Sequence, residues 1–330
     1  MSILLGDMLG LKFEVEPHAG ELIVICCQDS SMELTLNANF FNLGEQTWLK
    51  HESLPGLPLV NWDPQKDGLK VDLIEATVPV LYGQPGLVKE HGRWHMNLDL
   101  FGSVFFMLSR YEELIIPERD NYDRFPASAS IAYQSDFHER PIVDEYLEIL
   151  WTCMQQLWPQ LERKKPQPRF FLSCDIDQPY DCSVDTIGRL IRACAGDVLK
   201  HKDLPEMFKR INRYIFNKLG VYRFDPNYTF DWYMDCCEQA GLKAAFYFIP
   251  SSLEPNNGCY SLDDTKIKNL MLKINRRQHE IGLHGSFQTY RDKQKTIKQK
   301  GMLAKALDQV GIHQRITVNR QHYIRLDRAL

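Results

Sequence analysis

The second half of the chain alternates between short apolar runs and longer amphipathic segments, and this alternation restricts the folds open to it. Four apolar runs are typical of strands: 169–174, 244–249, 279–284 and 316–320. The segments between and after them are typical of helices, at 185–201, 229–240, 263–278 and 291–310. Strands that alternate with helices form βα units around a mainly parallel sheet. The spacing suits a (β/α) barrel or an open doubly wound sheet.

A segment rich in proline and charge, LERKKPQPR at 161–169, precedes this half. Such a composition resists packing and indicates a linker. We therefore predict a smaller N-terminal α+β domain at 1–160 and a C-terminal domain at 170–330. In the N-terminal domain, 21–27 is expected to be a buried strand, and 99–115 and 141–158 to be helices. The polar segment between those two helices is expected to be a loop with one short strand.

Composition narrows the function classes. The net charge of −4 lacks the basic excess typical of nucleic-acid-binding proteins. No apolar stretch approaches the length of about 18 residues that a membrane-spanning helix needs. No basic segment precedes the apolar residues at the start, so we expect a cytoplasmic protein. The nine cysteines form no C-x-x-C motif and include two adjacent pairs, which favours buried, reduced thiols.

Two carboxylates follow the first strand of the C-terminal half, where RFFLSC runs into Asp175-Ile176-Asp177. In parallel α/β folds the chemistry lies at the carboxyl ends of the strands. Residues i and i+2 of a strand point to the same face, so both carboxylates would share one site. Like charges this close require a metal, another cation or a raised pKa. The alternative, a D-x-D that only caps the next helix or is solvated, stays open.

The third strand ends in HEIGLHGS, which superficially resembles a zinc-binding H-E-x-x-H. Its two histidines, however, are five residues apart. On a strand that spacing puts them on opposite faces, and on a helix it separates them by about 140°. His279 and His284 should therefore not share a metal. His284, at the strand end, is the better candidate, although a single histidine is more often structural.

The fourth strand ends at Asn319-Arg320-Gln321-His322, where the same parity puts Arg320 and His322 on one face. An arginine beside a carboxylate orients it and lowers its pKa. A catalytic zinc typically has three protein ligands and one open position. Asp177, His284 and His322 would satisfy that number. A basic surface patch remains the alternative for Arg320 and His322.

FLSCDID, HEIGLHGS and NRQHYIR together resemble the polysaccharide deacetylases of carbohydrate esterase family 4, over roughly residues 168–330. The resemblance implies an incomplete (β/α) barrel of that type, acting on a carbohydrate. It implies that Asp175 is the catalytic base, that Arg320 orients it, and that Asp177 and His284 bind a divalent metal, Zn²⁺. The reaction would remove N- or O-acetyl groups from a bacterial glycan or glycan precursor. Four aromatic residues near the expected site could stack on sugar rings: Tyr180, Phe287, Tyr290 and Tyr323.

The N-terminal half also resembles a domain that precedes a deacetylase domain in some bacterial proteins of surface-polysaccharide loci. The segments that carry this likeness are DLFGSVFFMLSRYEEL, ERDNYDRFPASAS and ERPIVDEYLEILW. The role of that domain is not established, so the likeness predicts no chemistry.

Two departures from the deacetylase pattern bear on activity. Gln288 stands where the family has its second metal histidine, so His322 would have to replace it or metal binding would be weak. The sequence ends at Leu330, and we expect the barrel to lack its C-terminal strands and the late general-acid histidine. Both departures motivate a second hypothesis. The chain would then be a non-catalytic glycan-binding or assembly protein that retains a deacetylase-like fold.

Overall fold

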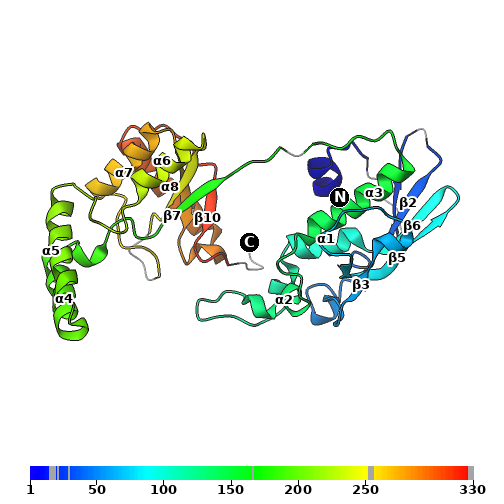
Figure 1. Ribbon diagram of the computed structural model, residues 1–330, viewed down its shortest axis with the longest axis horizontal. Coiled ribbons are helices and arrows are strands. Elements are labelled where there is room, and N and C mark those ends of the chain that lie inside the picture. Colours follow the sequence, from blue (N-terminus) through cyan, green and yellow to red (C-terminus); the bar gives the residue numbers. More distant parts are fainter. Residues whose placement is uncertain (15–19, 21, 29, 166, 252–255, 326–330) are drawn as a thin grey trace. The chain divides into compact units, whose positions relative to one another are not determined.

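The computed structural model describes residues 1–330 except 15–19, 21, 29, 166, 252–255 and 326–330. The chain divides into two compact units, 1–167 and 168–330 (Figure 1). The division lies within the proline- and charge-rich segment 161–169. The two units are nearly equal in length, so the expectation of a smaller N-terminal domain is wrong.

In its described residues, the N-terminal unit combines two sheets with three helices. Its main sheet has the order β1-β2-β6-β5, with β1 at Leu22–Cys26, β2 at Glu33–Asn37, β5 at Gly83–Glu90 and β6 at Arg93–Leu98. Strands β3 (Val60–Trp62) and β4 (Val78–Val80) form a separate pair. The helices are α1 (Leu100–Leu108), α2 (Ile131–Gln134) and α3 (Ile142–Leu157). Short helical turns are η1 (Ser2–Met8), η2 (His51–Ser53), η3 (Pro64–Asp67), η4 (Tyr111–Leu114) and η5 (Ala127–Ala129).

The core of this unit lies between α3 and the main sheet. Tyr146, Ile149 and Leu150 are fully buried along one face of α3. They belong to the same apolar cluster as Leu34 of β2 and Met96 of β6. This is the result expected for a helix with apolar residues at a spacing of three and four.

Three details of the N-terminal unit differ from expectation. Strand β1 lies at the edge of the sheet and alternates exposed with half-buried residues, so it is not a buried strand. Helix α1 ends at Leu108, because Arg110 adopts a positive φ of 53° that an α-helix cannot accommodate. The polar segment before α3 contains α2, whose first turn is capped by the Ser130 hydroxyl, and has no strand.

The C-terminal unit is built on a parallel sheet with the order β10-β9-β8-β7. Its strands are β7 (Leu172–Ile176), β8 (Ala244–Phe248), β9 (Glu280–Gly285) and β10 (Asn319–Gln321). The helices are α4 (Ile187–Gly196), α5 (Leu204–Lys218), α6 (Phe230–Gln239), α7 (Thr265–Arg276) and α8 (Lys293–Gln309). Shorter turns are η6 (Cys182–Val184), η7 (Asp197–His201) and η8 (Thr289–Arg291).

Helices cover one face of this sheet. Ile176, Phe246 and Leu283 point to that face, since alternate residues of a strand point to opposite sides. They share an apolar cluster with Met234 of α6, Ile267 of α7 and other buried residues of α6, α7 and α8. The opposite face carries a mostly polar set from the four strands: Ser173, Asp175, Tyr247, Gly282, His284 and Arg320.

The predicted incomplete (β/α) barrel of the deacetylase type is wrong. Over the described part of the chain, the sheet has four strands in chain order and does not close. It is curved rather than flat, because Asp175 of β7 and Arg320 of β10 lie 3.2 Å apart (Oδ2 to Nε) although these are its two outermost strands. In a flat sheet, three strand spacings would put the backbones of these two strands about 14 Å apart. The open doubly wound alternative fails too, since α6, α7 and α8 share one face of the sheet.

Two more features of the C-terminal unit were not expected. No element is predicted for 202–228, yet α5 occupies 204–218. Cys182 is bonded to Cys259, 77 residues away, whereas Cys26 and Cys236 are exposed. The prediction of buried, reduced thiols is therefore wrong for these four residues. Contacts between distant segments decide such pairings, and local sequence does not encode them.

None of the helices in the described ranges is both long and apolar enough to cross a bilayer.

Candidate metal centre

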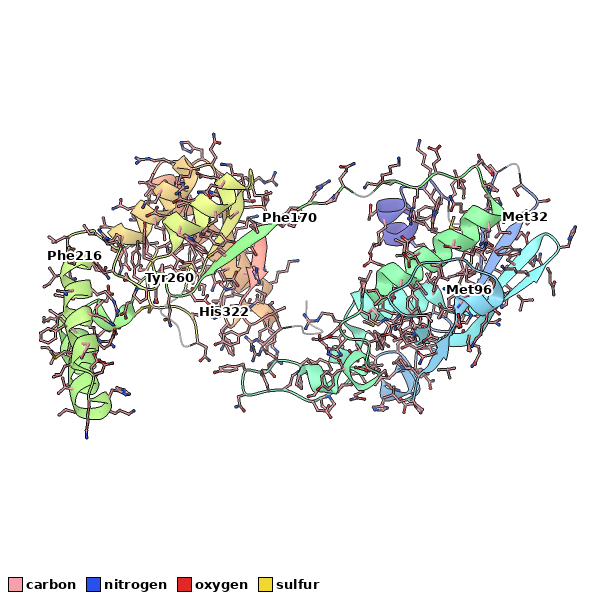
Figure 2. All side chains as sticks on the ribbon, in the orientation of Figure 1. Met32, Met96, Phe170, Phe216, Tyr260 and His322 are labelled. Atoms are coloured by element: carbon pink, nitrogen blue, oxygen red, sulfur yellow. A yellow bond between two sulfur atoms is a disulfide. The ribbon has the colours of Figure 1, made fainter. Side chains whose placement is uncertain are left out.

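The structure brings the five candidate residues of the C-terminal unit together at one edge of its sheet. Asp175 lies in β7 and Asp177 follows that strand directly. His284 lies near the end of β9, beside Arg320 of β10 in the strand register. His322, labelled in Figure 2, follows β10, and its backbone N–H donates to the Gly285 carbonyl. All these positions are carboxyl ends of parallel strands, which is where such sheets assemble their sites.

Three side chains at this edge offer ligand atoms that all lie within 4.8 Å of one another: Asp177, His284 and His322. Nε2 of His284 lies 3.4 Å from Oδ1 of Asp177. Nδ1 of His322 lies 3.7 Å from the same oxygen and 3.1 Å from Nε2 of His284. Both imidazoles are buried, and the carboxylate is half-buried.

Backbone carbonyls fix the tautomer of both histidines. Nδ1 of His284 lies 2.7 Å from the Arg320 carbonyl, and Nε2 of His322 lies 2.9 Å from the Asn256 carbonyl. A carbonyl only accepts hydrogen bonds, so these two nitrogens carry the protons of the neutral rings. The lone pairs then reside on Nε2 of His284 and Nδ1 of His322, the two atoms that face each other. Hydrogen-bonding the outward nitrogen in this way is typical of metal-binding histidines.

Three lone pairs therefore converge with no proton between them. Among the described residues, Oδ1 of Asp177 is buried without a hydrogen-bond partner. A buried acceptor in that position costs free energy unless a cation satisfies it. For metal–ligand bonds of about 2.0–2.1 Å in a tetrahedral site, ligand atoms should lie about 3.3 Å apart. The observed separations of 3.1, 3.4 and 3.7 Å fit a divalent cation.

The pKa shifts at the site favour the protonation states that bind metal. Burial raises the pKa of Asp177, but a hydrogen bond from His284 and the positive charges that His322 and His284 carry when protonated outweigh it, so this pKa lies below its usual range. For His322, burial lowers the pKa, and the attraction of Asp177 only partly opposes this. An ionised carboxylate and a neutral imidazole are the forms that coordinate a cation.

A carboxylate–arginine pair lies beside the three ligand atoms. The ion pair of Arg320 with Asp175 is the close one described above, and Nη1 of Arg320 donates to the Ser173 hydroxyl at 2.6 Å. Oδ2 of Asp175 lies 3.9 Å from Nε2 of His284. The Asp175 side chain is 30 % exposed, so a substrate or water can reach it. The pair is anchored, accessible and next to the ligand atoms.

Two glycines allow the strands and the turn at this site to pack closely, because they carry no side chain. A Cβ on Gly282 would lie 2.6 Å from the ring of Tyr247, which covers the polar face between β7 and β9. On Gly285, directly after His284, a Cβ would lie 2.8 Å from the Thr289 hydroxyl and 3.0 Å from Oε1 of Gln321. Any side chain there would displace the turn that follows the histidine.

Other sequence candidates lie outside the centre. His279 directly precedes β9, at the end of the strand opposite the centre, and its ring contacts Glu238. Gln288 is exposed and not part of the three-ligand cluster. Tyr180 packs on Tyr222 and Tyr228, and Tyr290 is buried, so neither presents a free face for sugar stacking.

Tyr323 does contact the centre, since its ring lies against that of His322 at 4.5 Å between centroids. Its other neighbour is the ring of Phe287, at 5.2 Å. Tyr323 is thus in direct contact with a proposed ligand, and Phe287 packs on Tyr323.

Sequence reasoning missed three supporting groups. Ser173 holds Arg320, and the Asn256 carbonyl orients His322. Tyr260, labelled in Figure 2, donates from its hydroxyl to the Ile176 carbonyl and accepts from the Ile249 N–H. It thereby ties the end of β7 to the end of β8. Parity within β7 could have suggested Ser173, whereas a backbone carbonyl leaves no signal in the sequence.

Fold and site together define an open α/β unit in which three residues could hold a metal ion beside an anchored carboxylate. Comparison with known proteins adds one finding, which concerns the other unit: a model of a family of unknown function (DUF7033) matches residues 1–159. No curated protein and no solved structure matches the chain. The candidate metal centre lies entirely outside the matched segment.

Proposed function

We propose that the C-terminal unit is a zinc-dependent hydrolase that removes acetyl groups from a bacterial glycan or glycan precursor. The observation that carries the proposal is the convergence of three unprotonated ligand atoms next to a partly exposed carboxylate held by arginine. Structural histidines and aspartates normally have hydrogen-bond partners. Here the unsatisfied Asp177 oxygen and the two facing imidazole lone pairs are arranged for a cation.

Asp177, His284 and His322 would hold the cation. When bound, it supplies a Lewis acid that polarises the carbonyl of the acetyl group. Asp175 acts as general base and takes the proton of the attacking water. Arg320 fixes the direction of that carboxylate through their ion pair, while Ser173 limits the motion of the arginine. The products are acetate and a free amine or hydroxyl on the sugar.

The acetylated-sugar substrate is supported by the deacetylase-like motifs and by the surroundings of the centre. A hydrolase that acts on a polymer or a bulky glycan needs its base to be accessible, and the Asp175 side chain is partly exposed. Tyr323 lies against His322 and Phe287 lies against Tyr323, and the two rings offer apolar surface for a sugar.

The decisive experiment measures zinc content and acetate release in parallel. Wild type should carry close to one zinc per chain and release acetate from N-acetylated oligosaccharides. Asp175→Asn should keep its zinc and lose about 10²- to 10⁴-fold in rate, because it removes the base and none of the three proposed ligands. Glu238→Gln, which alters a carboxylate at the opposite end of β9, should change neither.

Equal rates for wild type and Asp175→Asn would refute the role of the base. A chain without stoichiometric zinc, whose glycan binding survives Asp175→Asn, would instead identify a non-catalytic glycan-binding protein. Gln288, which stands outside the ligand cluster, is the feature that keeps this second hypothesis open.

A further inference from the structure

The C-terminal unit carries a helical hairpin whose surface is unusually apolar. This hairpin, residues 187–224, comprises α4, η7, α5 and the turn after them, and Figure 1 shows it outside the layer formed by α6, α7 and α8. Its exposed large apolar side chains are Ile187, Ile191, Leu199, Leu204, Phe208, Ile215, Leu219, Val221 and Phe224. A soluble protein rarely concentrates so much exposed apolar surface without a partner for it.

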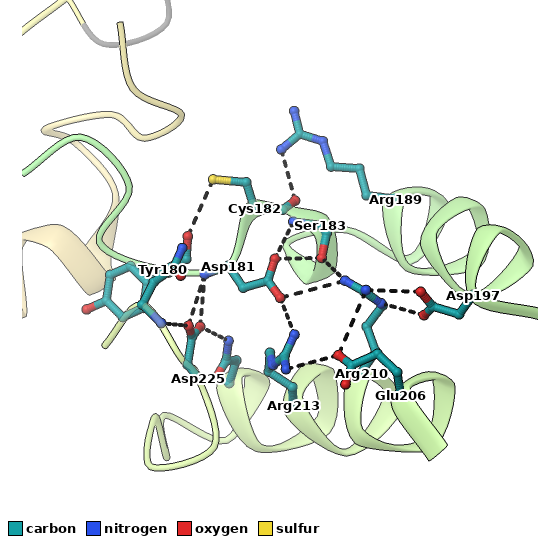
Figure 3. A network of polar contacts seen from close by, with 12 residues as sticks. Tyr180, Asp181, Cys182, Ser183, Arg189, Asp197, Glu206, Arg210, Arg213 and Asp225 are labelled. Atoms are coloured by element: carbon teal, nitrogen blue, oxygen red, sulfur yellow. Dashed lines mark hydrogen bonds and ion pairs between the residues drawn. The ribbon is translucent and has the colours of Figure 1, made fainter. Parts of the chain in front are cut away.

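Helix α5 packs with the opposite face to that of an ordinary surface helix. Its charged face is turned inward, with Arg213 buried and paired to Asp181 (Figure 3). Arg210 donates to Asp197 at 2.8 Å and to the Ser183 hydroxyl at 2.6 Å. A surface helix normally packs its apolar face and leaves its charges in water. In α5 this polar network attaches the helix to the rest of the unit.

The outward face of α5 is an apolar stripe. Leu204, Phe208, Ile215 and Leu219 follow one another at intervals of four, seven and four residues, which places them on one side of a helix. Their exposed fractions range from 47 to 71 %. With a rise of 1.5 Å per residue, the stripe is about 22 Å long. We call these four residues the α5 stripe.

The hairpin that carries the stripe is rich in positive charge. The hairpin contains nine Lys and Arg but only three Asp and Glu, in a chain whose net charge is −4. Asp197 is buried and Glu206 half-buried in the polar network, so Asp203 is the one exposed acid. The exposed basic residues are Arg189, Arg192, Lys200, Lys202, Lys209, Lys218 and Arg223. The hairpin thus buries most of its acidic groups and exposes most of its basic ones.

We propose that this hairpin docks the protein on the surface of an anionic lipid bilayer, with the α5 stripe inserted at the headgroup boundary. An apolar face bordered by Lys and Arg is the chemistry of helices that lie in the membrane interface. The long basic side chains can lie along apolar surface while their charges reach lipid phosphates. A nucleic acid would match the charge but would leave the stripe exposed. The docking is independent of the hydrolase activity proposed above.

Vesicle flotation of the full chain tests the proposal. Wild type should float with vesicles of phosphatidylcholine and phosphatidylglycerol at 7:3 and much less with phosphatidylcholine alone. Raising NaCl from 0.05 to 0.5 M should weaken the binding, because salt screens the basic residues. Phe208→Ser combined with Leu219→Ser should lower the partition coefficient at least about tenfold, since it removes two large apolar side chains.

A matched control is Trp232→Ser combined with Ile297→Ser, on α6 and α8. These side chains are 67 and 54 % exposed, similar to those of the stripe, but lie outside the hairpin. The control should bind vesicles as wild type does, and circular dichroism should show both double variants folded. Absence of flotation with anionic vesicles at 0.05 M NaCl would overturn the proposal. Equal losses in both double variants would do so too. Self-association abolished by Phe208→Ser would assign the stripe to a second copy instead.

Discussion

Nearly the same residue types lie at the two ends of strand β9, but their hydrogen bonding is opposite: one group is satisfied and the other is not. At the amino end, His279 lies beside Glu238 and Arg277. At the carboxyl end, His284 lies near Asp175 and Arg320. Residue content does not distinguish the two groups, because each combines a histidine, a carboxylate and an arginine.

Every group at the amino end has a partner. Nδ1 of His279 accepts from the Ala244 N–H at 3.0 Å, so Nε2 carries the proton and faces Glu238 at 3.2 Å. Arg277 donates to both oxygens of Glu238, and these hydrogen bonds lower the pKa of Glu238 to about 2. Burial lowers the pKa of His279 and keeps it neutral. A fully satisfied cluster of this kind stabilises the sheet and leaves nothing for a ligand.

The carboxyl end differs because its acceptors face one another. Two imidazole lone pairs and an Asp177 oxygen meet there without a donor. The comparison shows that unsatisfied polarity, rather than the presence of His and Asp, indicates a site. Three substitutions can break or sharpen this difference.

The largest effect should come from His284→Ala. Zinc affinity should fall at least about 100-fold, because even changes to groups that merely support a ligand cost 10- to 100-fold. Isothermal titration, or competition with a chelator, measures it. His279→Ala is the matched control on the same strand and should bind zinc as wild type does. Equal zinc affinities in the two variants would remove the distinction between the two ends.

For the free energy of unfolding the order of the two variants is reversed, and His279→Ala should have the larger effect. His279→Ala should lower the free energy of unfolding by about 2 kcal/mol, because it leaves the buried Ala244 N–H without its acceptor and opens a cavity. Urea denaturation of the metal-free protein, followed by circular dichroism, gives this value. If His279→Ala is as stable as wild type, the amino end is not the structural cluster described above.

The smallest expected effect is a gain in the free energy of unfolding rather than a loss. In metal-free protein at pH 8, Asp177→Asn should raise the free energy of unfolding by about 1 kcal/mol. Its amide can donate where the carboxylate only accepts, and so can satisfy a facing lone pair. The same urea experiment in the presence of a chelator measures the change. A destabilised Asp177→Asn would mean that the three acceptors are satisfied without a cation.

Much of the C-terminal unit could be predicted from local pattern. Strands β8 and β9 and helices α6, α7 and α8 lie within a few residues of the predicted ranges. Period and end signals are local, so they survive in the sequence alone. The parity of β9 separated His279 from His284, and the parity after β10 grouped Arg320 with His322. The structure places these four residues accordingly.

Other features were not predictable because they depend on contacts between distant segments. Helix α5 was not predicted, and its inward charged face depends on Asp181 and Asp197 in other segments. The bond between Cys182 and Cys259 and the Asn256 carbonyl on His322 likewise join segments far apart in the chain. Nothing near Asn256 in the sequence indicates that its carbonyl orients a histidine.

The sequence by itself determined which residues end the strands and which face each side chain takes, because strand parity is fixed by the backbone. The tertiary structure alone decided that the sheet stays open over the described residues. It also decided that the sheet curves enough to bring β7 and β10 together at Asp175 and Arg320. Curvature arises from twist and from packing on α6, α7 and α8, which act across the whole sheet. The centre therefore has its residues from the sequence and its geometry from the fold.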